Sequence, residues 1–253
     1  MRHKILSIAN QKGGVGKTTT AINLSACLSA AEKKVLLIDM DPQGNATSGL
    51  GLKRENGEFT IYDVLMNGGS IEKIITSTEV PFLFVCPSSR SLFEAEISLH
   101  GKEGREKRLL SALTPITNNY DYIIVDCPPS LGYLTLNSLV ACNSVIIPLQ
   151  CEYYAMEGLS DLLSTLDEVK RYLNPNLEIE GILLTMFDER TNLSHEVEKE
   201  IRGVFGQKVF KTVVPRSVKL SEAPSFGKPI ILYDIKSKGA IAYLNLAKEI
   251  LGR

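Results

Sequence analysis

The chain has 253 residues and a formal net charge of −1, and its hydrophobic and charged fractions, 44% and 23%, are ordinary for a soluble globular protein. No apolar run approaches the roughly 20 residues that a membrane-spanning helix needs, and the amino terminus carries no secretory signal. The five cysteines show no C-x-x-C spacing, which argues against a zinc or iron–sulfur site and favours the reduced thiols of a cytosolic protein.

Charge is unevenly distributed along the chain. Residues 190–253 contain 12 Lys and Arg against 6 Asp and Glu, a net charge of +6, whereas residues 1–189 contain 16 against 23, a net charge of −7. A basic carboxyl-terminal quarter on an acidic body makes a phosphate-binding face possible. The same charges could be spread around the surface, and the sequence leaves both arrangements open.

The stretch of residues 4–20 predicts a buried strand, a glycine loop and the start of a helix, which we expect to span residues 17–31. Gly13, Gly14 and Gly16 lack Cβ atoms, so the loop backbone can turn its amides inward at the positive end of the helix dipole. Such a cradle binds the phosphates of a nucleotide.

Side chains around this loop complete the predicted nucleotide site. Lys17 would reach the β- and γ-phosphates, the Thr18 hydroxyl would ligate Mg²⁺, and Thr19 is placed to touch the α-phosphate. The predicted nucleotide-binding residues of the loop are Lys12, Gly13, Gly14, Val15, Gly16, Lys17, Thr18 and Thr19.

An apolar strand at residues 34–38 runs into Asp39 and Asp41, two positions apart. An extended backbone would point both carboxylates to the same side of the strand's carboxyl end, where open α/β sheets place their ligands. Two carboxylates beside a phosphate loop would repel a nucleotide, unless a cation or a proton-transfer role requires them. Either acid could instead cap a turn.

Secondary structure is hardest to predict from the sequence for residues 46–120. We expect short helices near residues 61–66 and 70–75, a strand at 82–85, and helices at 91–100 and 105–114.

The next strand, residues 122–126, ends in Asp126 and has the Walker B form. Asp126 would hold Mg²⁺ through its water shell. Beyond it we expect strands at 144–149, 178–185 and 208–212, and helices at 152–173, 194–205 and 237–251. Strands that are apolar throughout suit a mostly parallel, twisted sheet with helices on both faces, so an α/β fold in one domain spanning residues 1–253 is predicted.

The glycine loop departs from the ordinary P-loop pattern G-x-x-x-x-G-K-[ST], because Gln11 stands where the first glycine is expected. The run K-G-G-V-G-K-T, residues 12–18, is similar to the deviant Walker A loop of ParA/MinD ATPases, a class of P-loop NTPases. In that class the early lysine crosses the interface of an ATP-bound dimer and touches the other subunit's phosphates. The resemblance implies this catalytic role for Lys12, which could otherwise be a solvated loop lysine.

Other segments resemble the ParA/Soj family in the same order and spacing. Residues 39–45 are similar to its first switch, which implies that Asp41 orients the attacking water and that Asp39 supports the magnesium site. Residues 214–229 are similar to the family's adenine-side segment, which implies that Pro215 and Ser217 contact the base or ribose.

The resemblance also implies contacts with DNA. Family members place DNA-contacting basic residues at the positions of Arg190 and Lys219, and Arg216 is a neighbouring candidate. The family often has arginine where this chain has Lys219, and lysine neutralises phosphate without the bidentate fork. Each of the three could instead be an ordinary surface charge.

Taken over nearly the whole chain, the resemblance implies a chromosome-partitioning ATPase that is weakly active alone and uses ATP and Mg²⁺. It would form a homodimer around ATP, bind double-stranded DNA of the nucleoid non-specifically, and release it when a ParB-type protein triggers hydrolysis. A cytoplasmic, nucleoid-associated location without stable membrane association is expected.

Several alternatives are weighed against this interpretation. A MinD-like ATPase would need a basic amphipathic carboxyl-terminal helix, whereas residues 244–253 carry mixed charge. A metal-cluster carrier would need paired cysteines, and a nucleotide-binding protein that does not hydrolyse conflicts with Asp41. Only three residues precede the first strand, so we expect no amino-terminal DNA-binding extension.

Overall fold

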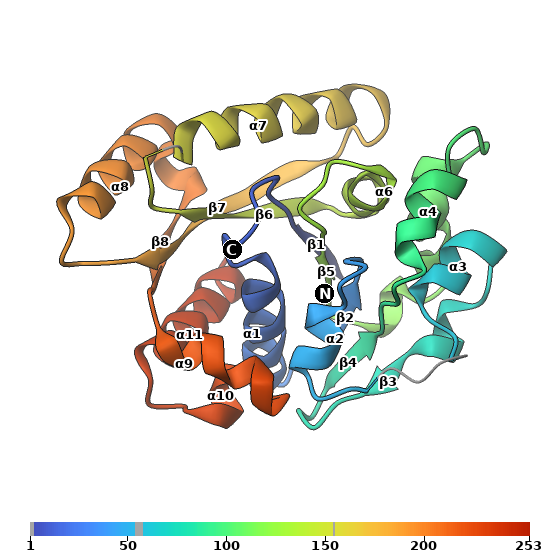
Figure 1. The fold of residues 1–253 in the computed structure, drawn as a ribbon, viewed down its shortest axis with the longest axis horizontal. Helices are drawn as coiled ribbons and strands as arrows, with labels where there is room; N and C mark the ends of the chain where they lie inside the picture. Colours follow the sequence, from blue (N-terminus) through green and yellow to red (C-terminus); the bar gives the residue numbers. More distant parts are fainter. Residues whose placement is uncertain (1–2, 54–57, 154) are drawn as a thin grey trace.

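The computed structural model describes residues 3–53, 58–153 and 155–253 (Figure 1). In this part of the chain an eight-stranded sheet has the order β3-β4-β2-β5-β1-β6-β7-β8. The strands are β1 (Lys4–Ile8), β2 (Val35–Asp39), β3 (Thr76–Ser77), β4 (Leu83–Cys86), β5 (Tyr122–Asp126), β6 (Ser144–Gln150), β7 (Glu178–Phe187) and β8 (Val209–Pro215). Only β3 is antiparallel to its neighbour among these strands, which confirms the mostly parallel sheet.

Helices connect the strands and cover both faces of the sheet, as Figure 1 shows. They are α1 (Lys17–Ala30), α2 (Asn45–Gly49), α3 (Ile61–Asn67), α4 (Leu92–Ser98), α5 (Arg108–Leu113), α6 (Tyr133–Ala141), α7 (Ala155–Tyr172), α8 (Asn192–Phe205), α9 (Val218–Glu222), α10 (Ile230–Tyr233) and α11 (Lys238–Leu251). Helices α3 to α8 pack on one face, and α1, α2, α10 and α11 pack on the other.

The strands supply two hydrophobic cores because successive side chains point to opposite faces. In β1, Ile5 packs with the α3 to α8 layer, while Leu6 packs with the α1 and α11 layer. Ile123 and Ile124 of the neighbouring β5 divide in the same way. Burial on both faces explains why these strands are apolar throughout, and it leaves the strand ends as the places for polar chemistry.

Helix α6 was not predicted from the sequence. Its buried residues lie on every side and include the polar Thr135, Asn137 and Ser138, so no amphipathic period marks it. Its amino terminus has no local side-chain cap; instead Glu96 of α4 accepts the backbone N–H groups of Tyr133 and Leu134, at 2.7 and 3.0 Å. This long-range cap fixes the loop that leads from β5 into α6.

Other elements differ from expectation mainly at their ends. The predicted helix 152–173 begins at Ala155 in the structure, and Tyr154 lies outside the described residues. Strand β7 runs two residues beyond the predicted end, to Phe187, and β8 continues to Pro215. The short helix predicted at residues 70–75 is a 3-10 helix, Ile71–Ile74.

The last helix, α11, is built into the core. Tyr243, Leu246 and Ile250 are buried, whereas Ile241 and Leu251 are exposed, and the Tyr243 hydroxyl lies 3.1 Å from the Thr20 hydroxyl of α1. The helix therefore fixes the position of α1 behind the glycine loop. Of the helices in the described ranges, none combines the length and apolarity that crossing a bilayer demands.

Candidate nucleotide-binding site

The glycine loop lies between β1 and α1 at the carboxyl edge of the sheet. Gly14 and Gly16 have φ angles of +75° and +89°, which side chains with a Cβ rarely adopt. Gly16 caps α1 without any side-chain hydrogen bond, so no side chain satisfies the first backbone N–H groups of that helix. These amides and the helix dipole are suited to bind an anion.

Neighbouring strands hold the loop in place. The Thr185 hydroxyl of β7 donates to the Val15 carbonyl at 2.8 Å. Asn10 donates through Nδ2 to the Pro148 carbonyl at 2.7 Å, and its Oδ1 accepts the Lys12 backbone N–H at 3.0 Å. The cradle is thus supported from β6 and β7 before any ligand arrives, which lowers the entropic cost of binding.

The Lys17 ammonium is folded back against this loop. The residue is 7% exposed, and its Nζ donates to the Lys12 carbonyl at 2.9 Å. Burial lowers the pKa of Lys17, while the nearby Asp126, Cys127 and Asp41 oppose that shift. A buried cation with one neutral acceptor is ready to exchange that acceptor for phosphate oxygens.

Two buried carboxylates lie side by side behind the loop. Asp39 of β2 and Asp126 of β5 are register partners, and both are 0% exposed. Asp39 is well hydrogen-bonded, since its Oδ2 accepts the Thr47 N–H and hydroxyl at 2.8 and 2.7 Å. Burial nevertheless raises the pKa of Asp39 to about 6.

Asp126 lacks such partners. Neither carboxylate oxygen accepts a hydrogen bond of normal geometry from the described residues, although the nearby Thr18 hydroxyl acts to lower the pKa. Burial, reinforced by the charge of Asp39, raises the pKa of Asp126 well above the usual range. An orphaned buried carboxylate beside a phosphate cradle fits a divalent cation, whose charge would replace the missing partners.

Asp41 lies just beyond β2, at the same edge. It is 7% exposed, and its Oδ1 accepts the Gln43 backbone N–H at 2.9 Å. Its backbone carbonyl accepts the Gly44 N–H at 2.8 Å, which closes a turn. Asp41 thus occupies a fixed turn close enough to Lys17 to influence its pKa, a position from which a carboxylate can order a water molecule.

Lys12 makes a contact that sequence reasoning did not find. Its Nζ lies 3.0 Å from Glu152 Oε2, with side-chain exposures of 40% and 45%. The other oxygen, Oε1, accepts a hydrogen bond from Gln150 at the end of β6. No local signal points to Glu152, because 140 residues separate it from Lys12 and only the sheet order brings them together.

The predicted adenine-side segment follows β8. Pro215 is the register partner of Phe187 in β7, and the Arg216 N–H donates to the Phe187 carbonyl at 3.0 Å. Ser217 caps the short helix α9 without a side-chain hydrogen bond. The carboxyl end of β7 therefore touches both the glycine loop, through Thr185, and this segment.

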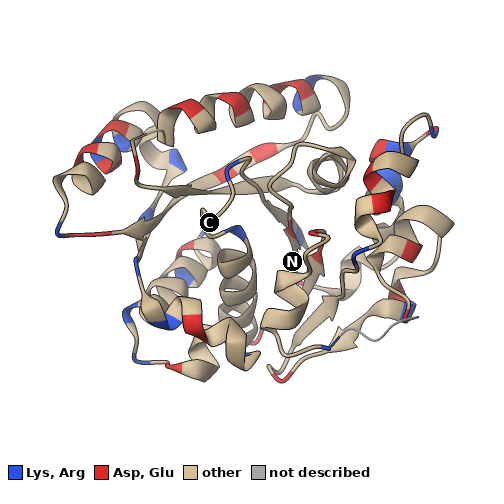
Figure 2. Ribbon diagram, viewed as in Figure 1, with Lys and Arg blue, Asp and Glu red and all other residues tan. Residues whose placement is uncertain are grey.

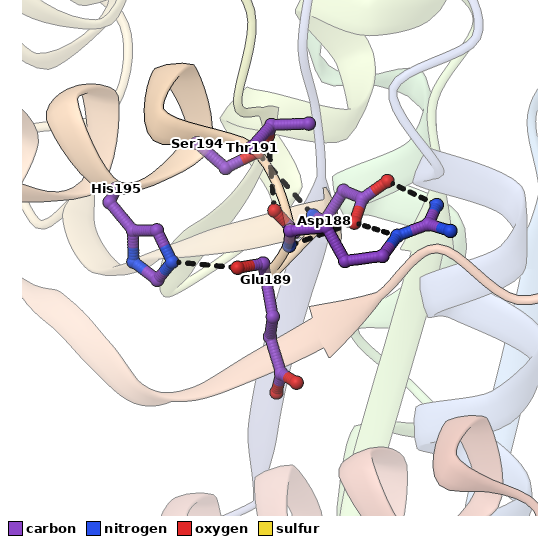
Figure 3. Close-up of polar contacts among 6 residues, drawn as sticks. Asp188, Glu189, Thr191, Ser194 and His195 are labelled. Carbon is purple, nitrogen blue, oxygen red and sulfur yellow. Dashed lines mark hydrogen bonds and ion pairs between the residues drawn. The ribbon is translucent and has the colours of Figure 1, made fainter.

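The three predicted DNA-contacting residues lie in the segments that follow β7 and β8. Arg190 follows β7, and its exposed guanidinium pairs with Asp188 (Figure 3). Arg216 is exposed, and Lys219 on α9 is 3.1 Å from Glu222. Helix α7, in contrast, carries Asp and Glu at several positions along its length, as Figure 2 shows.

The cysteines are all buried and unpaired: Cys27, Cys86, Cys127, Cys142 and Cys151. Burial raises the pKa of the Cys127 thiol, next to Asp126, so this thiol stays protonated near neutral pH. The described part of the chain holds no group of three or more His, Cys, Asp and Glu residues arranged to bind a metal ion.

Comparison with known proteins agrees with this geometry. A family profile described as an AAA domain matches residues 3–179. The chain is 59% identical over 250 residues to the chromosome partitioning protein ParA of Myxococcus xanthus, covering 99% of this chain and 88% of that protein. It is 58% identical over 247 residues to the sporulation initiation inhibitor protein Soj of Bacillus subtilis, covering 98% of each.

Solved structures share the fold. Cobyrinic acid a,c-diamide synthase from Mycobacterium smegmatis, crystallised with ADP and magnesium, has a TM-score of 0.87 at 36% identity over 99% of this chain and 97% of that one. MinD from Pyrococcus horikoshii, complexed with Mg-ADP, has a TM-score of 0.81 at 24% identity over 98% and 96%. The second likeness concerns the fold alone.

Sheet order, glycine loop and buried carboxylates define a P-loop nucleotide-binding protein of the deviant Walker A class. Within that class, the chain belongs to the ParA/Soj family of chromosome-partitioning ATPases. This confirms the family and the fold expected from the sequence.

Proposed function

We propose that this chain is a Mg²⁺-dependent ATPase of one domain that dimerises around ATP and binds DNA without sequence preference as that dimer. A ParB-type partner would stimulate hydrolysis and release the DNA, so that the cycle serves partition of a chromosome or plasmid. The protein would act in the cytoplasm, on the nucleoid. Its near full-length identity with ParA and Soj supports this cycle.

One structural observation carries the proposal. The carboxyl end of β7 contacts the glycine loop through Thr185, and Arg190 lies five residues further along the chain, just after the strand ends. Nucleotide and DNA would therefore bind at the same edge of the sheet. A change at the loop can reach the cations through one strand end, which gives a physical route for coupling the two ligands.

The roles of the site residues follow from their positions. The loop amides and the Lys17 ammonium would bind the phosphates, while Thr18, Asp39 and Asp126 would hold Mg²⁺. Magnesium, when bound, neutralises charge on the phosphate oxygens during transfer. Pro215 and Ser217 would border the base or ribose. Asp41 would orient the attacking water and accept its proton.

We expect Asp126→Asn to change stability in opposite directions with and without ligand. Because the pKa of Asp126 is raised in the fold, ionising it destabilises the folded chain as pH rises above the ordinary carboxyl range. Removing that charge should stabilise the nucleotide-free protein by about 1–3 kcal/mol near neutral pH. The same change should remove most of the further stabilisation that ATP and Mg²⁺ give.

Thermal unfolding with and without ATP and MgCl₂ checks this prediction. Asp121→Asn is a matched control at a half-buried position just before β5, where the amide oxygen can still accept the Lys34 N–H. A lower melting temperature for the nucleotide-free Asp126→Asn protein, or an undiminished response to Mg²⁺, would contradict the assignment.

Asp41→Asn should slow hydrolysis while leaving ATP binding intact. The amide keeps an oxygen for the Gln43 N–H but cannot accept a proton, so we expect turnover to fall by roughly 100-fold or more. The ATP dimer should then stay on DNA. Phosphate release and the rate of DNA dissociation after dilution measure both effects, and unchanged turnover would remove Asp41 from the mechanism.

The whole cycle is tested by measuring binding to duplex DNA of arbitrary sequence without nucleotide, with ADP and with ATP. Binding that requires ATP and weakens steeply with salt is expected. Equal binding in all three states would refute the proposal. Tyr243, Leu246 and Ile250 of α11 are buried in the core, and sedimentation with anionic liposomes in ATP distinguishes the proposed role from a MinD-like membrane role.

A further inference from the structure

Two of the three cations proposed to contact DNA already have a carboxylate partner in the same chain. The Arg190 Nε and Nη2 donate to Asp188 Oδ1 and Oδ2 at 2.9 and 2.7 Å, the two contacts drawn from the Asp188 carboxylate in Figure 3. Oδ1 also accepts the Arg190 backbone N–H at 3.1 Å. The Arg190 side chain is 86% exposed, so this bidentate pair faces solvent.

The Asp188 pair belongs to an ordered loop. The Asp188 carbonyl accepts the Thr191 N–H and hydroxyl at 3.1 and 3.0 Å, and the Thr191 hydroxyl oxygen lies 2.9 Å from the Ser194 hydroxyl oxygen. Figure 3 shows the Glu189 carboxylate directed away from that of Asp188. The backbone therefore sets the position of one particular acid beside Arg190.

Lys219 has an equivalent partner on α9. Its Nζ lies 3.1 Å from Glu222 Oε2, and the same oxygen accepts the Tyr233 hydroxyl at 2.9 Å. The ammonium also lies 5.4 Å from the centre of the Tyr233 ring. Glu222 is thus held in place by α10 and compensates the Lys219 charge.

Arg216 differs from both. It is exposed, and no carboxylate of the described chain lies within ion-pair distance of it. Its charge acts on Asp188, whose pKa is lowered first by hydrogen bonds from Arg190 and also by the field of Arg216. Asp188 therefore lies in the field of two arginines that we propose as phosphate contacts.

We propose that Asp188 and Glu222 are electrostatic brakes on DNA binding, which keep the affinity of a single protomer low and leave DNA binding to the dimer. This inference rests on the proposed function. Non-specific affinity rises steeply with the number of phosphates that a protein neutralises, and a cation already paired with a carboxylate neutralises less. A dimer joins two faces that each bind DNA weakly. Once one face is bound, the other binds the same DNA molecule intramolecularly, which multiplies the affinity.

A positioning role for the same acids predicts the opposite result. If Asp188 served to orient the Arg190 guanidinium, neutralising it would weaken DNA binding. If the two acids are brakes, neutralising them strengthens DNA binding, because negative charges that repel the DNA phosphates are removed from the surface that faces them. The sign of the change separates the two roles.

The test is the double variant Asp188→Asn, Glu222→Gln in the full chain. Each amide keeps an oxygen in place, so the Arg190 backbone N–H and the Tyr233 hydroxyl retain their acceptors. Fluorescence anisotropy with a labelled duplex of arbitrary sequence, with ADP and with ATP, reports affinity between about 50 and 200 mM KCl. Thermal unfolding verifies that the variant is folded.

We expect affinity in the ADP state to rise about two- to fivefold for each substitution. The slope of log affinity against log salt should become steeper by up to about 1 for each acid removed, because each freed cation can neutralise a phosphate. In the ATP state the gain should be larger, since both protomers contribute a face.

The matched control is Asp167→Asn, Glu168→Gln, which removes the same two charges from exposed positions of α7. These residues lie near the end of α7 that leads into the start of β7, whereas Asp188 follows the end of that strand. An equal gain in the control would show a general effect of net charge and would overturn the brake. Unchanged or weaker binding by Asp188→Asn, Glu222→Gln would overturn it as well.

A second double variant distinguishes a failure of the proposed brake from a failure of the proposed function. Arg190→Glu with Lys219→Glu should abolish most DNA binding in ATP while leaving the dimer intact. If binding persists, the DNA-contacting face is wrong and both proposals fail. If binding falls while Asp188→Asn, Glu222→Gln has no effect, only the brake is refuted.

Discussion

Lys17→Ala will abolish ATP binding at ordinary nucleotide concentrations. The lysine is the one side-chain cation we place inside the phosphate cradle, and its Nζ is held 2.9 Å from a loop carbonyl. Two charge-assisted contacts of about 1.5–3 kcal/mol each would be lost, which corresponds to roughly 100-fold or more in affinity. The fold should survive, because removing a buried amine whose pKa is lowered relieves a desolvation cost.

Isothermal titration with ATP and Mg²⁺ measures this loss, and thermal unfolding establishes that the variant is folded. Lys73→Ala, an exposed lysine outside the site, is the matched control and should bind ATP normally. ATP affinity within about threefold of the parent for Lys17→Ala, where the 1.5–3 kcal/mol contacts predict far more, would refute the loop assignment.

Lys12→Ala will leave ATP binding largely intact and prevent dimerisation. In the single chain Lys12 pairs with Glu152 at 3.0 Å, and both side chains are partly exposed. Such a pair contributes at most about 1 kcal/mol. A contact with the partner's phosphates inside an interface would contribute about 2–3 kcal/mol, and two-fold symmetry repeats it, so dimer formation should fall by roughly 1000-fold or more.

Glu152→Gln distinguishes the two contacts of Lys12. Both variants break the ion pair with Glu152, but only Lys12→Ala would remove the lysine from the partner's phosphates that we propose it contacts. Light scattering with ATP, in the Asp41→Asn background to suppress hydrolysis, should show a dimer for Glu152→Gln and a monomer for Lys12→Ala. A dimer in both would refute the role of Lys12 across the interface.

Most of the fold was accessible from the sequence, because a parallel sheet buried on both faces has apolar strands that end abruptly in polar residues. Asp39 and Asp126 marked the ends of β2 and β5 correctly, and the structure makes them register partners. Helix α6 was not predicted because its buried residues, polar ones included, show no amphipathic period and its cap comes from Glu96, far away in the sequence.

The candidate site also has a part that the sequence predicts and a part that only the structure shows. The glycine loop, its lysines and the acids at the strand ends are local patterns whose spacing indicates phosphate and magnesium chemistry. Glu152 beside Lys12 and the tether of Thr185 to the loop have no local pattern, because the order of β1, β6 and β7 in the sheet creates them.

The sequence by itself determined the class of chemistry, since a loop of glycines followed by Lys17 and Thr18 carries its backbone geometry and its charge in consecutive residues. Only the tertiary structure decided how the charges are compensated. Asp126 accepts no hydrogen bond of normal geometry from the described residues, Lys12 is paired, and Glu222 is shared by Lys219 and Tyr233. Electrostatic energies depend on distance and burial, and packing sets both.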